Sequence, residues 1–480
     1  EAYNNLGSLL QGLSKMEEAL ASLRQAIMLE PKYVEAHINL GNLLKRLDRL
    51  EEAEASYQRA IVFNPHSANA HFNLGNTLKE LGRFERAEAS LRKAIALSSD
   101  YAEAHFNFAN LLQELGRLKD AEASYVQAIA SKPNYAEAHN NLGNTLKELG
   151  RFRETEASYR KAIEIKPDYT EAHHNLGVLL YDNKEYNLAA EQFKLSDIPR
   201  SKLYEIKCAY YQDQKTTFYD KFNILVAKDG INASIGSLGL LSEAKFGLKI
   251  DNPFCNHPLD YVSKINLIER CDFKNLFIKT AKDILKDGSV SFREQNLLTN
   301  GFQTAGNIFK QVKIYQKEIE SVIHDEIEKY RFHFKDSEEG FIKNWPAYYE
   351  VKGWLICMKS GGKLSPHMHD GSWISGSIYI NVPPKKEPDS GNIVLCLTDQ
   401  RDLLEEEKIH QTIIDVVTGS LCLFPSSLHH FTIPFEEKEE RIVLAFDVGE
   451  GDSTDEVAIE WAEEYGMPNV PNFSQMGGEQ

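Results

Sequence analysis

Three histidines in the C-terminal part of the chain have types and a spacing that could hold a metal ion. His367 and His369 lie in Ser-Pro-His-Met-His-Asp, and His430 lies much later, in Leu-His-His-Phe-Thr-Ile-Pro. On an extended strand, residues i and i+2 point to the same side, so the imidazoles of the pair can enter one interior together. A neighbouring pair followed by a distant third ligand is the spacing of a facial iron site, which leaves coordination positions open.

The parity of the later strand separates His430 from its neighbour His429. Adjacent strand residues face opposite sides, so only one of the two can point inward. Phe424, Leu428, His430 and Thr432 share one parity, and we therefore expect His430 to point inward. His429 is expected to be a hydrogen-bonding partner or a surface residue.

Arg441 could complete such a site. It lies on a predicted strand, Glu-Arg-Ile-Val-Leu-Ala-Phe-Asp-Val, whose apolar residues make burial plausible. The planar guanidinium fits a carboxylate bidentately, so it could hold the far end of a dicarboxylate that chelates the metal at its other end. Tyr379 could donate a second hydrogen bond to that carboxylate, or could be a packed core tyrosine. The alternative for Arg441 is a surface arginine that forms ion pairs with nearby glutamates.

Short β-rich runs must position these side chains. Eight short strands at this spacing suggest a double-sheet jelly roll or barrel, the double-stranded β-helix, over residues 346–450. The candidate strands are 350–358, 365–370, 374–381, 391–398, 412–416, 419–424, 429–434 and 440–447.

The strings of this region resemble a known enzyme family over about residues 345–450. HMHDGSWISGSIYINVP, SGNIVLCL, GSLCLFPSSLHHFTIP and ERIVLAFDV look like the 2-oxoglutarate/iron(II)-dependent dioxygenases, and in particular a branch with His-x-His followed by Ser-Gly-x-x-Tyr. The resemblance implies a double-stranded β-helix, iron(II), 2-oxoglutarate and dioxygen as cofactors, and oxidation of a C–H bond, most often hydroxylation.

One position departs from that family. Most members carry His-x-Asp or His-x-Glu before the distal histidine, whereas here the second place is His369 and the acid follows at Asp370. Strand parity favours three histidine ligands, His367, His369 and His430. A bulge in the strand would let Asp370 coordinate instead.

The N-terminal two-fifths of the chain is a repeat array. Glycine recurs at a step of 34 residues or twice that, and alanine and proline recur in register with it. The small residues let paired helices approach closely, and proline ends a helix because it lacks a backbone donor. Over roughly residues 1–203 these series resemble six tetratricopeptide repeats, of the kind that precede O-linked GlcNAc transferases. The glycines are Gly7, Gly41, Gly75, Gly143 and Gly177, with Ala109 in the remaining place.

Asparagine and histidine also recur in the first helix of the repeats. The asparagines are expected to line the concave groove and to grip a protein or peptide backbone, since each amide both donates and accepts. A solvated or inter-repeat polar position is the alternative. The histidines, one per repeat, lie too far apart to share an ion and are expected to pack. The asparagines are Asn5, Asn39, Asn73, Asn107, Asn141 and Asn175.

The remaining segments carry no visible chemistry. Residues 204–224 are expected to be capping helices, 225–345 a helical support region of the oxygenase, and 451–480 a C-terminal tail. Within the support region, residues 298–302 read as a loop. The first residue is Glu and falls inside a repeat, so we expect the chain to be a fragment whose targeting signal would lie upstream.

Composition limits the partners and the compartment. The formal net charge is −17, which argues against nucleic acid or an anionic membrane as a partner. No apolar run has the length of a membrane span. The six cysteines are scattered without a Cys-x-x-Cys pair, which favours a reducing cytoplasm.

Three functions fit these features. The first is a multidomain α plus β enzyme, an iron(II)/2-oxoglutarate dioxygenase that hydroxylates a protein or peptide presented by the repeats. The second is a non-catalytic scaffold with a degenerate cupin domain. The third is a cupin-type metalloenzyme that needs no 2-oxoglutarate. A glycosyltransferase is disfavoured because no paired nucleotide-sugar domains are recognisable.

Overall fold

The computed structural model describes residues 1–247, 250–287, 290, 292–293, 297–304, 306–369, 371–397 and 411–451. Asp370 and the tail beyond residue 451 therefore lie outside the described residues. The chain divides into two compact units, Glu1–Ser201 and Lys202–Gln480. Within the described residues, no helix combines the length and the apolar character needed to cross a membrane.

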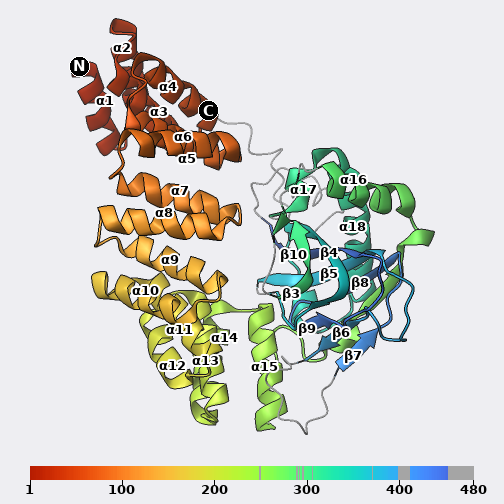
Figure 1. Cartoon of the computed structure of the whole chain (residues 1–480). Helices are drawn as coiled ribbons and strands as arrows, with labels where there is room; N and C mark the ends of the chain where they lie inside the picture. The colour runs from red at the N-terminus through yellow and green to blue at the C-terminus, as the bar shows by residue number, and fades with distance from the viewer. Residues whose placement is uncertain are drawn as a thin grey trace, which may run out of the picture. The chain divides into compact units, whose positions relative to one another are not determined.

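The first unit is a stack of helix pairs, coloured red to yellow in Figure 1. Small residues let the two helices of a pair approach closely: a Cβ added to Gly41 would lie 2.5 Å from the ring of Tyr57, and one on Gly143 would lie 2.5 Å from the ring of Tyr159. The helices are α1 (Ala2–Gly12), α2 (Met16–Leu29), α3 (Val34–Arg46), α4 (Leu50–Phe63), α5 (Ala68–Glu80), α6 (Phe84–Leu97), α7 (Ala102–Glu114), α8 (Leu118–Ser131), α9 (Ala136–Glu148), α10 (Phe152–Ile165), α11 (Thr170–Asp182) and α12 (Tyr186–Leu195).

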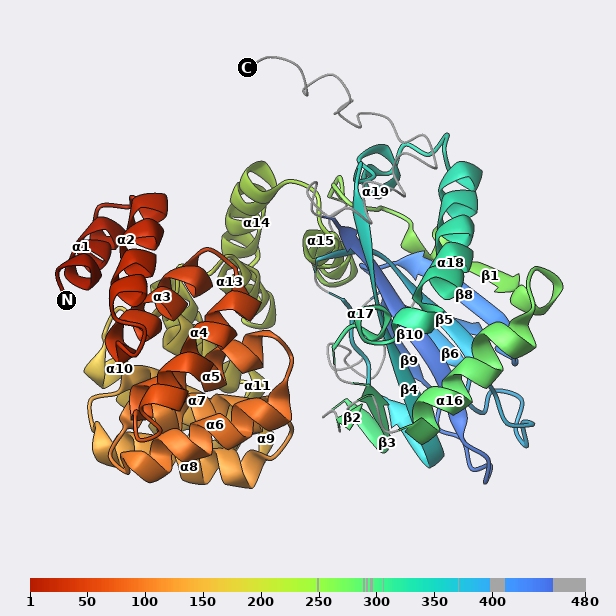
Figure 2. The same ribbon diagram turned by 90° about the horizontal axis from the view of Figure 1, so that it is seen from above.

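Helices continue after the repeats. In chain order they are α13 (Pro199–Tyr211), α14 (Lys215–Asp229), α15 (Ala233–Phe246), η1 (Pro258–Tyr261), η2 (Leu267–Glu269), η3 (Lys274–Lys279), α16 (Thr280–Asp287), α17 (Ile308–Gln311), α18 (Lys313–His333) and α19 (Gly340–Lys343). An aromatic-rich cluster that includes Tyr210, Phe218 and Phe222 holds α13, α14 and α15 together. Figure 2 shows α16 and α18 lying along one side of the sheet.

The second unit contains two antiparallel sheets. The larger has the order β1-β8-β5-β10-β4-β3-β2 and the smaller β7-β6-β9. The strands are β1 (Ser263–Asn266), β2 (Phe292–Arg293), β3 (Leu298–Thr304), β4 (Tyr349–Leu364), β5 (Ser372–Asn381), β6 (Ile393–Cys396), β7 (Gln411–Ile414), β8 (Ser420–Pro425), β9 (His429–Thr432) and β10 (Arg441–Glu450).

Two expectations from the sequence were wrong here. The support region is not purely helical, because it supplies β1, β2 and β3 to the larger sheet, and residues 298–302 lie in β3 rather than in a loop. No regular strand forms over the described part of 365–370. Instead His367 makes an isolated bridge with His430. The backbone N–H of each donates to the carbonyl of the other, at 3.1 Å and 2.8 Å.

The larger sheet has two different faces. Leu355, Ile378 and Leu444 on one face belong to the main apolar core, together with Ile323 and Ile327 of α18. The alternate residues of β4, β5 and β10 point the other way, toward the smaller sheet, because successive strand residues face opposite sides. That second face lines the cavity that contains His367, His369 and His430.

Candidate metal centre

His367, His369 and His430 meet in one place. One ligand nitrogen from each lies within 4.8 Å of the others, and the ring centroids are 4.2 to 5.1 Å apart. His430 is on β9, and the other two are on the segment that follows β4. His429 was expected to be a partner or a surface residue; it is 5% exposed, which excludes the surface alternative, and its carbonyl accepts from the Cys396 thiol at 3.5 Å.

Two of the three rings are oriented through Nδ1. His369 Nδ1 lies 2.6 Å from Asp447 Oδ2, and His367 Nδ1 donates to the Ser365 carbonyl at 2.9 Å. A ring that donates through Nδ1 keeps its Nε2 lone pair for a metal, and such outer partners commonly orient metal-binding histidines. Trp354 also stacks on His369, with ring centroids 5.5 Å apart.

The surroundings of His367 and His430 favour neutral imidazoles. Burial, followed by the neighbouring His369, lowers the pKa of His367 to about 4. Burial also lowers the pKa of His430 well below its ordinary value, with His367 and His369 adding to the effect. Neutral nitrogen donors converging on one point are the donor set that iron(II) and similar divalent ions accept, so these residues fit a resident metal.

Rows of paired residues run across the face of the larger sheet that borders the cavity. Arg441 pairs with Met358, and Val443 pairs with Ile356 and Tyr379. The next rows toward the end of β10 are Trp354–Ala445–Ser377 and Lys352–Asp447–Ser375. The residues along β10 with the parity of Arg441 therefore run from Arg441 at one end to Asp447 at the other.

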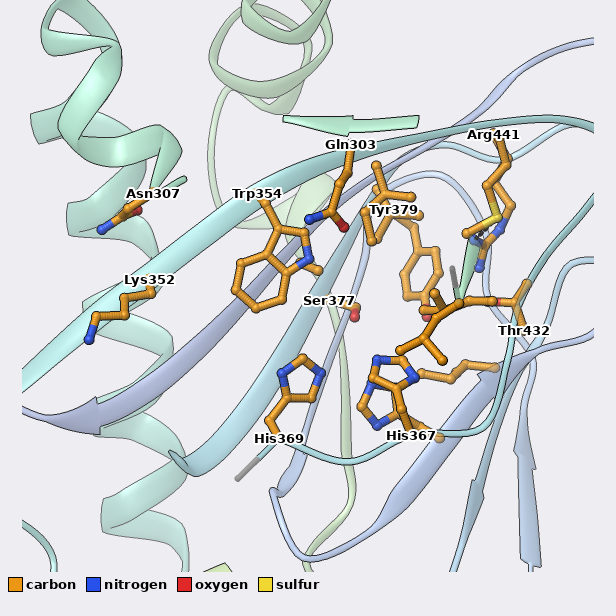
Figure 3. Close-up of a pocket in the computed structure, with 18 of the residues that line it drawn as sticks. Gln303, Asn307, Lys352, Trp354, His367, His369, Ser377, Tyr379, Thr432 and Arg441 are labelled. Carbon is orange, nitrogen blue, oxygen red and sulfur yellow. Dashed lines mark hydrogen bonds between the residues drawn. The ribbon is translucent and has the colours of Figure 1, made fainter. Parts of the chain in front are cut away.

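The cavity has a volume of about 410 Å³. Figure 3 shows Arg441 and Tyr379 toward one end, His367 and His369 between, and Lys352 and Asn307 toward the other end. Its walls also include the apolar side chains of Leu297, Ile356, Met358, Leu364, Ile393 and Val443. The histidines thus lie between an arginine end and a more polar opposite end.

Arg441 is buried, and none of the described residues gives it an acidic partner. It is 2% exposed, its guanidinium carbon lies 5.0 Å from the centre of the Tyr379 ring, and one nitrogen contacts Met358 Sδ at 3.8 Å. Among the described residues no carboxylate pairs with it, and its Nε has no hydrogen-bond partner. Burial lowers its pKa. A buried cation that lacks a counter-charge is costly, so this end of the cavity suits an anion. The burial of Arg441 argues against the alternative that it is a surface residue paired with the preceding glutamates.

Four of the six recurring asparagines form hydrogen bonds between neighbouring repeats. Asn39, Asn107, Asn141 and Asn175 each donate to an asparagine of the preceding repeat, at 2.9 to 3.0 Å. An amide has a second N–H and an accepting oxygen, so these side chains keep capacity for a ligand. The recurring histidines each contact the carbonyl six residues earlier, as in His37 with Pro31 at 2.9 Å.

Family models match both parts of the chain. A tetratricopeptide model matches residues 12–48, 45–82, 75–116 and 109–150, and a second matches 136–169. A model described as "Putative 2OG-Fe(II) oxygenase" matches residues 352–447, which hold the histidines and Arg441. Tetratricopeptide repeats are joined in this chain to a 2OG-Fe(II) oxygenase domain. In that domain the matched residues include most of β4 and all of β5, β6, β7, β8 and β9.

Solved structures resemble part of the chain. Pseudomonas aeruginosa pilF is 22% identical, with a TM-score of 0.38, over 41% of this chain and 92% of that one. YrrB, described as a TPR protein with an unusual peptide-binding site, is 26% identical, with a TM-score of 0.32, over 38% of this chain and 90% of that one. Comparison with curated proteins gives no match.

Sequence reasoning missed three side chains of the oxygenase domain. Asp447 was in view within the predicted last strand, six residues after Arg441 and on the same parity, and that pattern could have identified it. No pattern in the sequence marked Trp354, because an aromatic residue on a partly apolar strand is typical of a core position. Gln303 lies on β3, in the segment where no chemistry was expected.

Proposed function

We propose that this chain is an iron(II)/2-oxoglutarate-dependent dioxygenase that hydroxylates a protein or peptide delivered by the repeats. One observation carries the proposal: a cluster of three histidines shares its cavity with a buried arginine that has no acidic partner among the described residues. A dicarboxylate with a 2-oxo acid group needs both features, one at each end.

The proposal assigns a role to each group. His367, His369 and His430 would hold iron(II), with Ser365 and Asp447 orienting two of the rings. Arg441 would bind the far carboxylate of 2-oxoglutarate. Tyr379, whose ring lies against the guanidinium, would orient that carboxylate or its arginine. Iron(II), when bound, supplies the redox chemistry with dioxygen that oxidises a substrate C–H bond. The apolar walls would exclude water from that reaction.

The repeats supply the second half of the proposal. The family of these repeats supports binding of a protein or peptide. Asn39, Asn73, Asn107, Asn141 and Asn175 would grip a peptide backbone through the amide groups that the inter-repeat bonds leave free.

Anaerobic titration with iron(II) and then 2-oxoglutarate tests the enzyme assignment. A weak visible charge-transfer band should form in the native chain, and His430→Ala should abolish both the band and the retained metal. His429→Ala is the matched control. Absence of any band, together with unchanged metal content in His430→Ala, would favour a non-catalytic scaffold. Turnover that survives Arg441→Ala would favour a metalloenzyme that needs no 2-oxoglutarate.

A further inference from the structure

A buried amide in the cavity has no role in holding the metal or the 2-oxo acid. Gln303 is 3% exposed and lines the cavity. Figure 3 shows it directed into the cavity, as is Trp354. Both side chains therefore present polar groups to the cavity, where a ligand with matching donors and acceptors can pair with them.

The register separates Gln303 from the arginine end. Gln303 pairs with Ile356 on β4, and Ile356 pairs with Val443 on β10, two residues from Arg441. Two strand spacings and one two-residue step put the backbones of Gln303 and Arg441 about 12 Å apart. One dicarboxylate held by Arg441 and by the histidines would not need Gln303. The amide therefore belongs to a different part of the cavity.

The chemistry of the two side chains defines the ligand. A glutamine amide offers both a donor and an acceptor, and an indole offers a donor. Apolar Leu297, Leu364 and Ile356 share the cavity. A charged group placed there would lose its hydration without gaining a counter-charge from these residues. An uncharged carboxamide matches the amide's donor and acceptor at once.

We propose that Gln303, with Trp354 beside it, binds a carboxamide group of the substrate and so places a neighbouring carbon at the metal centre. This inference rests on the proposed function and names its substrate class. The carboxamide comes either from a peptide main chain or from an asparagine or glutamine side chain. In both cases Gln303 is a positioning residue that selects amides over esters.

Direct binding measurements test this subsite without turnover. The full chain, loaded with nickel(II) as a redox-inert metal and with 2-oxoglutarate, is titrated with N-methylpropionamide and with methyl propionate, the ester that lacks any N–H. Propionamide is the third probe. We expect the N-methylamide or propionamide to bind roughly tenfold tighter than the ester, because the ester cannot donate to Gln303. The amide that binds tighter identifies a main-chain or a side-chain source.

Gln303→Leu should remove that preference and leave the affinities for nickel(II) and 2-oxoglutarate unchanged. Gln411→Leu, an exposed glutamine on β7, is the matched control and should keep the preference. Failure of the native chain to prefer either amide, or a preference that survives Gln303→Leu, overturns the inference. Loss of 2-oxoglutarate binding in the native chain with the amide preference intact would instead overturn the proposed function.

Discussion

His369 Nδ1 lies 2.6 Å from a carboxylate oxygen of Asp447, on the last strand of the larger sheet. Asp447 also accepts from Ser375 Oγ at 2.8 Å, which fixes the carboxylate in turn. The three histidines carry no negative charge of their own. The Asp447 carboxylate therefore acts on the centre by pairing with the His369 ring and not as a direct metal ligand.

Asp447→Ala should weaken divalent metal binding by about 10- to 100-fold, because metal-binding histidines depend on the partner of their second nitrogen. Calorimetric titration with cobalt(II) measures the affinity, and the visible cobalt spectrum reports the altered ligand field. Asp415→Asn, at an exposed carboxylate that pairs with Lys385, is the control. An unchanged cobalt affinity in Asp447→Ala would remove Asp447 from the site.

Arg441→Gln should weaken 2-oxoglutarate binding by at least about 30-fold, since truncating a buried charged partner commonly costs 2–5 kcal/mol. The 2-oxoglutarate affinity of Arg441→Lys should lie between those of the native chain and Arg441→Gln. Lysine keeps the positive charge but cannot bind a carboxylate through two parallel N–H groups. Titration of the nickel-loaded chain measures both affinities. Metal binding should not change in either variant, and Arg153→Gln on the exposed side of α10 should match the native chain. Equal affinity in Arg441→Gln would contradict the assignment.

Removing a groove asparagine should test both of its roles. Asn141→Ala loses the 3.0 Å bond to Asn110 and should lower the unfolding free energy of the repeats by about 1 kcal/mol. The multiple alanine variant at Asn39, Asn73, Asn107, Asn141 and Asn175 should also lose affinity for peptide ligands. Thermal melts and peptide titration report the two effects. Asn187→Ala, exposed on α12, is the control.

Gly143→Ala should destabilise the repeats by about 1–3 kcal/mol, because the new methyl would lie 2.5 Å from a ring carbon of Tyr159. Tyr159 cannot move away freely, since its hydroxyl donates to Asn144 Oδ1 at 2.7 Å. Gly12→Ala is the matched control, because nothing lies within 4 Å of its added Cβ. That variant should be neutral or slightly more stable in a thermal melt.

Acid should destabilise the second unit through His324. Burial lowers the pKa of this histidine to about 4, while the nearby Asp325 acts in the opposite direction. An unfolded histidine titrates near 6.5, so the unfolded state binds the proton first as the pH falls. The contribution of His324 to the free energy of unfolding is therefore fully present above about pH 6.5 and is lost as the pH falls toward 4. It amounts to about 3 kcal/mol.

His324→Phe keeps the stack on Tyr349, whose ring centroid is 5.1 Å away, but cannot titrate. Denaturant unfolding of the metal-free chain between pH 7 and pH 4 should therefore show a smaller loss of stability in this variant. His333→Phe, exposed at the end of the same helix, should retain the native pH dependence. Parallel curves for all three proteins would rule out a contribution from His324.

The sequence by itself determined the parts of the molecule whose signals are local or periodic. The 34-residue series identified the repeats because each unit makes the same contacts with its neighbours. The short β-rich runs identified the late strands, and the parity of Phe424, Leu428 and Thr432 selected His430 over His429. These patterns depend on residues close together in the chain.

Only the tertiary structure decided what the long-range pairing brings together. The register of β4 and β10 sets Asp447 within reach of His369 and buries Arg441 beside Tyr379. The pairing of β3 with β4 brings Gln303 into the cavity from a segment that had been expected to be helical support. Strand order and register depend on which distant residues exclude water together, and no short stretch of sequence encodes that choice.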